Sequence, residues 1–187
     1  MVAPVITRKR FTATQYESLT ATGVLTKDDH VELIDGHIIH LAPITPPRAA
    51  TVSRLNQLLH QSSLSSVLIR AHGPIKVDDY SELQSDISIV RWRSDCYASA
   101  FPQAHDVLLL IEVVESSLSY DRDVKLSLYA RAGIPEVWIV ALLPQTVEGF
   151  RSPRESVYGE SAVFRRGDAV TALNLPQVTL TVDSILG

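Results

Sequence analysis

The sequence predicts an α/β (α+β) fold in which helices flank a mixed central sheet. Two apolar runs, Val107 to Val114 and Val137 to Leu142, are typical of buried strands. The segment between them, Asp121 to Ala132, is predicted to form a helix that ends at Gly133, with Pro135 just beyond it. A buried strand, a helix and a second buried strand together indicate a βαβ-like unit within a mixed sheet.

Helices and strands also alternate on the N-terminal side of this unit. FTATQYESLTATG predicts a short helix, with Thr12 or Thr14 as its N-cap and Gly23 as a stop signal. VELIDGHIIHLAP predicts a tight hairpin, because Asp35-Gly36 is a strong turn signal. The other expected elements are an amphipathic helix at 49–64, strands at 67–71, 75–77 and 85–90, a loop or short helical excursion at 92–106, and short strands at 161–164 and 178–182.

The composition is that of an ordinary globular domain. The chain has 187 residues, of which 45% are hydrophobic and 20% charged, enough for one domain (1–187) with a sizeable core. The formal net charge of -4 argues against a strongly basic coat for nucleic acid. It leaves room for a local basic groove around acidic metal ligands.

Several classes of protein are excluded by what the sequence lacks. Cys96 is the single cysteine, so neither an intrachain disulfide nor a cysteine-built zinc site can form. No Gly-rich phosphate loop, GxSxG or HExxH motif is present, and the six histidines are scattered. The apolar runs are too short to span a bilayer, and MVAPVITRKRF lacks the apolar core of a secretory signal. We therefore expect a cytoplasmic protein with no membrane partner.

Glu112 is the most informative residue, because it lies inside the apolar run VLLLIEVV. An isolated carboxylate in an apolar layer costs of the order of several kcal/mol, so it normally has a metal, a cation or a proton beside it. Glu32 in VELIDG and Asp86 in DISIV are also carboxylates in strand-like segments, on the face opposite their apolar neighbours. Oxygen ligands of this kind suit Mg²⁺ or Mn²⁺, which can hold a phosphodiester and activate a water.

Lys125 is the candidate partner of these acids. Asp121, Lys125 and Tyr129 line one face of the predicted helix at a spacing of four. The neighbouring apolar stripe would pack on the sheet, so Lys125 is expected at the edge of the seam, reaching toward Glu112.

A structural interpretation stays open for each of these residues. Glu32 fits a solvated hairpin position, Asp86 a turn cap, and Glu112 a structural ion pair with an arginine. Asp121 and Lys125 fit an ordinary surface pair on a helix. Spacing alone does not decide between these readings and a shared site.

The order VELIDG, LQSDISIV and LLLIEVVESSLSYDRDVKLSLYARAGIPEVWIV resembles the Uma-two family of restriction-endonuclease-like proteins, within the PD-(D/E)xK nuclease superfamily. The resemblance runs from about Phe11 to Val140. It implies a restriction-endonuclease-like mixed sheet with extra N- and C-terminal strands, and a divalent-metal site that cuts the phosphodiester bonds of nucleic acid, with DNA as the expected substrate.

Carried over residue by residue, the resemblance makes Glu32, Asp86 and Glu112 the metal ligands and catalytic acids. The lysine of the E-x-K motif is expected at position 114, where this chain has Val114, and Lys125 on the following helix takes its place. The accessory residues that the resemblance suggests are Gln84, Asp121 and Arg48.

Two departures from the family pattern stand out. Ser85-Asp86 replaces Pro-Asp, and Arg48 lies where the family often has histidine. The function expected is that of an endonuclease dependent on Mg²⁺ (or Mn²⁺). The alternative is a catalytically inactive nuclease-fold protein that acts as an interaction module for nucleic acid or protein. A homodimer, formed through the apolar C-terminal strands, is also expected.

Overall fold

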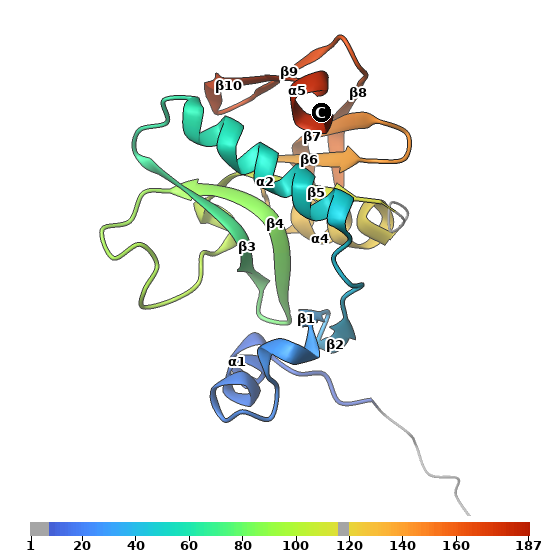
Figure 1. The fold of residues 1–187 in the computed structure, drawn as a ribbon. Helices are drawn as coiled ribbons and strands as arrows, with labels where there is room; N and C mark the ends of the chain where they lie inside the picture. The colour runs from blue at the N-terminus through green and yellow to red at the C-terminus, as the bar shows by residue number, and fades with distance from the viewer. Residues whose placement is uncertain (1–7, 116–119) are drawn as a thin grey trace, which may run out of the picture.

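The computed structural model describes residues 8–115 and 120–187, and its centre is a mixed sheet (Figure 1). The strand order is β2-β1-β4-β5-β6-β7-β8, and β3 pairs with β4 off this path. The strands are β1 (Val31–Ile34), β2 (His37–His40), β3 (Val67–Asp78), β4 (Ser81–Arg91), β5 (Val107–Val114), β6 (Glu136–Ala141), β7 (Thr146–Arg154) and β8 (Val157–Phe164). Two further strands, β9 (Ala169–Ala172) and β10 (Leu175–Thr181), form a separate antiparallel ribbon.

The βαβ-like unit is present, and the predicted fold class is confirmed. β5 and β6 pair in parallel, whereas the other strand pairs are antiparallel. The connection contains a π-helical turn, η3 (Asp121–Lys125), that leads directly into α4 (Leu126–Arg131). The other helices among the described residues are α1 (Ala13–Ala21), η1 (Lys27–Asp29), α2 (Pro46–Gln61), η2 (Ala104–Asp106) and α5 (Val182–Leu186).

Apolar layers cover both faces of the sheet. On one face α2 contributes Val52, Leu55 and Leu59 to a core shared with alternate residues of β4 and β5. On the other face α4 packs Leu128 and Tyr129 against the opposite set of strand residues. Figure 1 shows α2 crossing in front of the sheet and α4 behind it. Successive strand side chains alternate between the face covered by α2 and the face covered by α4. This alternation determines which strand residues point toward α4.

The N-terminal elements hold β1 in place. Thr12 caps α1 through a capping box, as one of the two predicted alternatives. Tyr16 of α1 donates its phenol to the carbonyl of Val31 at 2.9 Å, and Leu33 packs on the same helix. Glu32 and Ile34 alternate with Val31 and Leu33 along β1. Their side chains therefore lie on the other face of the strand.

The structure corrects several predicted boundaries. α2 begins at Pro46 rather than at residue 49, because Thr45 caps it and proline tolerates the first turn of a helix. The strands predicted at 67–71 and 75–77 are one strand, β3, and the predicted helix at 121–132 begins with a π turn. β7 and β9 were not predicted.

The homodimer prediction rests on the apolar C-terminal strands, of which β8 exposes Val157 and Val163. The apolar side chains of β9 and β10, among them Val170, Val178 and Leu180, are buried in the core of this chain. They are not available to a second copy. The homodimer and the single domain both stay predictions.

Candidate active site

A gap in strand pairing along β4 creates the site. β3 covers one edge of β4 along its length, from Ser81 to Arg91. On the other edge, β1 pairs at Glu82 and β5 pairs only from Ile87 onward. The stretch of β4 between these two contacts, which contains Gln84 and Asp86, thus has no strand partner on that edge. The backbone N–H and carbonyl of Gln84 are satisfied by side chains instead.

Glu32 and Lys125 fill the gap at Gln84. The Gln84 N–H donates to Glu32 Oε2 at 3.1 Å, and the Gln84 carbonyl accepts from Lys125 Nζ at 3.2 Å. Lys125 Nζ lies 3.3 Å from Glu32 Oε2. Gln84, predicted as an accessory residue, takes part here through its backbone.

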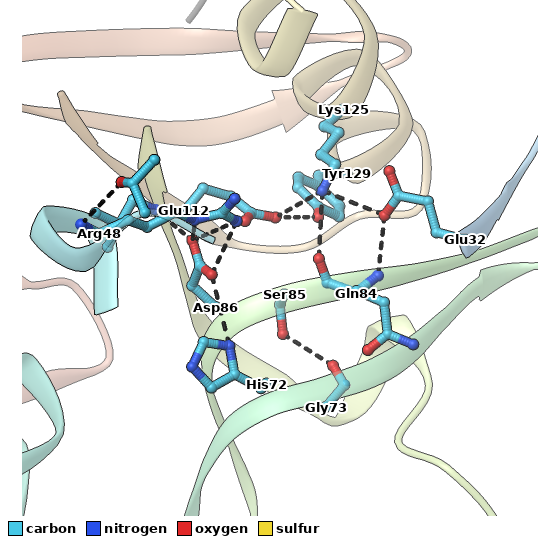
Figure 2. Close-up of polar contacts among 12 residues, drawn as sticks. Glu32, Arg48, His72, Gly73, Gln84, Ser85, Asp86, Glu112, Lys125 and Tyr129 are labelled. Carbon is cyan, nitrogen blue, oxygen red and sulfur yellow. Dashed lines mark hydrogen bonds and ion pairs between the residues drawn. The ribbon is translucent and has the colours of Figure 1, made fainter. Parts of the chain in front are cut away.

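Lys125 also reaches Glu112, as the helix periodicity predicts. Its ammonium lies 3.6 Å from Glu112 Oε1, and the Lys125 side chain is only 4% exposed. Lys125 is the last residue of the π turn. A π turn inserts one extra residue into a helix, which changes the direction of the side chains around it and is frequent at functional sites. Two buried carboxylates from different strands therefore share one ammonium (Figure 2).

Tyr129 completes the surroundings of Glu112. Its phenol donates to Glu112 Oε1 at 2.6 Å, and both residues are buried. Tyr129 follows Lys125 by four residues, so one helix face presents a cation and a hydroxyl to the same carboxylate. The spacing was visible in the sequence, but it gave no reason to assign Tyr129 a role.

Asp86 is held separately, where β5 diverges from β4. The Val113 N–H donates to Asp86 Oδ2 at 2.8 Å. Arg48 contacts the same carboxylate with two nitrogens of its guanidinium: Nη2 lies 2.9 Å from Oδ1, and Nε lies 3.2 Å from Oδ2. Arg48 is in the first turn of α2, so the early start of that helix brings the guanidinium to Asp86. Bidentate contacts of this kind are the strong class of ion pair.

His72 lies beside Asp86, and nothing in the sequence indicated this. Its Nδ1 lies 3.7 Å from Asp86 Oδ1, and its side chain is 47% exposed. The register pairs Ala71 with Ile87 and Gly73 with Ser85, which places His72 beside Asp86. His72 has a φ of 51°, a left-handed conformation that is uncommon outside glycine and that clusters at functional sites. Only the β3–β4 pairing reveals this neighbour.

Two further sequence predictions concern Ser85 and Asp121. Ser85, which replaces the proline of the family motif, is buried and donates its hydroxyl to the Gly73 carbonyl at 3.2 Å. The serine thus adds a link between β3 and β4 beside Asp86. The side chain of Asp121, predicted as an accessory residue, lies outside the described part of the structure.

The carboxylates are suited by chemistry to a divalent cation. Glu32, Asp86 and Glu112 are at most 2% exposed, and among the described residues the permanent cations placed on them are Lys125 and Arg48. Carboxylate oxygens are donors that suit the hard cations Mg²⁺ and Mn²⁺.

The arrangement of the same carboxylates is that of ion pairs. Within residues 8–115 and 120–187, no three His, Cys, Asp or Glu side chains are gathered as metal ligands. In this arrangement both oxygens of Asp86 are engaged by Arg48.

Comparison with known proteins places this chain in a family. The family model Uma2, described as "Putative restriction endonuclease", matches residues 13–183. The chain belongs to the Uma2 family. The match extends well past Val140, so the C-terminal strands are part of the Uma2 domain even though the sequence motifs of the resemblance end before them. The Uma-two resemblance of the sequence is confirmed.

A solved structure supports the Uma2 fold. The crystal structure of a putative nuclease belonging to DUF820, from Anabaena variabilis, matches with a TM-score of 0.75 over 94% of this chain and 97% of that one. Its sequence identity is 17%, so the likeness concerns the fold. No curated protein matches this chain. Among the helices of the described residues, none combines the length and apolarity needed to cross a membrane.

Proposed function

We propose that this Uma2 protein is a divalent-metal-dependent endonuclease that hydrolyses phosphodiester bonds of DNA. The observation that carries the proposal is the position of Lys125, whose ammonium lies between Glu32 and Glu112. A lysine beside paired carboxylates is what the E-x-K motif supplies in related nucleases. Here it comes from the helix after the strand, and Val114 occupies the usual position.

Glu32, Asp86 and Glu112 would hold the Mg²⁺ or Mn²⁺ ion. Once bound, such an ion lowers the pKa of a water and offsets the charge of the phosphate. The protein keeps each carboxylate in place through a donor of its own: the N–H of Gln84 for Glu32, the N–H of Val113 for Asp86, and the phenol of Tyr129 for Glu112. Ligands oriented in this way lose little freedom when an ion arrives.

Lys125 supplies positive charge where negative charge develops. Its ammonium is buried beside the carboxylates, so its field is screened less than it would be in water. It stabilises the additional charge on the phosphate oxygens during attack and orients the attacking water. The substrate approaches from the Asp86 side, where Arg48 and His72 are the partly exposed members of the site.

Cleavage assays with matched variants test this function. Single- and double-stranded DNA are incubated with wild type, Asp86→Asn and Lys125→Met, with Mg²⁺, with Mn²⁺ and with EDTA. We expect metal-dependent cleavage by the wild type and a loss of about 10²–10³-fold or more in each variant. Lys9→Met is the control, because Lys9 is an exposed lysine that lies over the Phe11 ring. Equal cleavage by all four proteins, or none by any, would contradict the proposal.

The contact between Arg48 and Asp86 favours a second candidate. A guanidinium on a predicted metal ligand is also what a nuclease fold without catalysis would have. Such a protein would bind nucleic acid or another protein without cutting. Binding of labelled DNA in the presence of Mn²⁺, detected by fluorescence anisotropy and accompanied by no cleavage, would favour this second function.

A further inference from the structure

Arg48 occupies the carboxylate that an incoming metal ion needs. Its Nη2 lies 2.9 Å from Asp86 Oδ1 and 3.0 Å from Asp86 Oδ2, and its Nε lies 3.2 Å from Oδ2. Both oxygens of Asp86 are therefore engaged by one guanidinium. A divalent cation binding to either oxygen would come close to that positive charge. The two cations cannot both hold the carboxylate closely, because their charges repel.

The fold keeps Asp86 in place independently of Arg48. Asp86 Oδ2 also accepts from the Val113 N–H at 2.8 Å, and this donor belongs to the central strand. The Asp86 side chain is 3% exposed, whereas that of Arg48 is 23% exposed. The carboxylate is thus the fixed partner, and the arginine is the one that solvent reaches.

The position of Arg48 on its helix makes it easier to displace. Arg48 lies in the first turn of α2, where its N–H donates to the Thr45 hydroxyl at 3.4 Å. A cation at the N-terminus of a helix is repelled by the helix dipole. The helix dipole therefore disfavours the guanidinium at this position, whereas the Asp86 carboxylate attracts it.

We propose that Arg48 and the divalent ion compete for Asp86, so that the ion binds only when the guanidinium has left the carboxylate. This inference rests on the proposed metal-dependent function and concerns how the ion enters the site. Arg48 acts as an internal counter-cation that keeps Asp86 neutralised before metal binding. The apparent affinity for metal is then the intrinsic affinity multiplied by the fraction of time that Arg48 spends away from Asp86.

Calorimetric titration with Mn²⁺ measures this competition. Arg48→Met removes the charge but keeps an unbranched side chain, and a bidentate charge-assisted contact is strong enough for its loss to tighten Mn²⁺ binding by about tenfold to a hundredfold. Arg131→Met is the control, since Arg131 pairs with Asp35 and Asp78 on the surface. It should bind Mn²⁺ as the wild type does.

A second variant keeps the test decisive if Arg48→Met does not fold, which circular dichroism would show. Arg48→Lys replaces the fork by a single ammonium, and we expect it to bind Mn²⁺ several-fold more tightly than the wild type. Wild-type binding that is equal to or tighter than that of the folded Arg48 variant overturns the competition and leaves the metal-dependent function standing. If neither the wild type nor the variant binds Mn²⁺, the function fails and the inference fails with it.

Discussion

Replacing Lys125 by methionine removes the ammonium that two buried carboxylates share. Lys125 Nζ lies 3.3 Å from Glu32 Oε2 and 3.6 Å from Glu112 Oε1, and neither acid is more than 1% exposed. Removing one partner of a buried pair costs about 3–5 kcal/mol, because the other charge is left uncompensated. Two acids lose their cation here, so we expect the free energy of unfolding to fall by about 4 kcal/mol. That is a large share of the total stability of a domain, which is about 5–15 kcal/mol.

Urea unfolding at neutral pH in EDTA, followed by circular dichroism, measures this loss. Lys9→Met should change the free energy of unfolding by less than about 0.5 kcal/mol, because Lys9 is exposed. Glu32→Gln in the Lys125→Met background removes one of the two carboxylate charges that have lost the ammonium. The double variant should therefore lose less free energy of unfolding than the sum of the losses of the two single variants. A loss below about 1 kcal/mol for Lys125→Met, the size of an exposed pair, would refute a buried shared cation.

Three further predictions concern single side chains. Tyr129→Phe removes the 2.6 Å hydrogen bond to Glu112 and should lower the free energy of unfolding by about 1.5–3 kcal/mol, as measured by urea unfolding. Burial, with Glu17 beside it, raises the pKa of Glu82 from 4.5 to about 7. The protonated form is thus favoured by folding. The stability it contributes is complete below pH 4.5 and is lost as the pH rises through about 7. The advantage of Glu82→Gln over wild type in urea unfolding should therefore grow by about 3 kcal/mol between pH 4.5 and pH 8. His72→Gln should slow DNA cleavage by about tenfold or more while changing stability by less than about 0.5 kcal/mol, and an unchanged rate would exclude His72 from the site.

The parts of the fold set by local pattern could be predicted from the sequence. The run Val107 to Val114 is a strand with the bounds expected, and the cap at Thr12 and the hairpin at Asp35-Gly36 also form. The proximity of Lys125 to Glu112 followed from helix periodicity and from the order strand, helix, strand. Each of these depends on residues near one another in the chain.

The parts set by long-range pairing could not be predicted. His72 meets Asp86 only because β3 and β4 pair in one register, and no local pattern near His72 indicates that register. Arg48 reaches Asp86 because α2 starts at Pro46 and crosses the sheet. The sequence showed only that Arg48 stands where the family often has histidine, and it did not indicate a contact with Asp86. The unpaired stretch of β4 at Gln84 depends on where two other strands stop.

Anomalous diffraction from crystals grown or soaked with Mn²⁺ tests most directly whether the three carboxylates form a metal site. We expect an anomalous peak in contact with Asp86 and Glu112, with Glu32 in its surroundings and with the Arg48 guanidinium turned away from Asp86. A peak elsewhere on the protein, or none at Mn²⁺ concentrations that support cleavage, would contradict the assignment of these carboxylates as metal ligands.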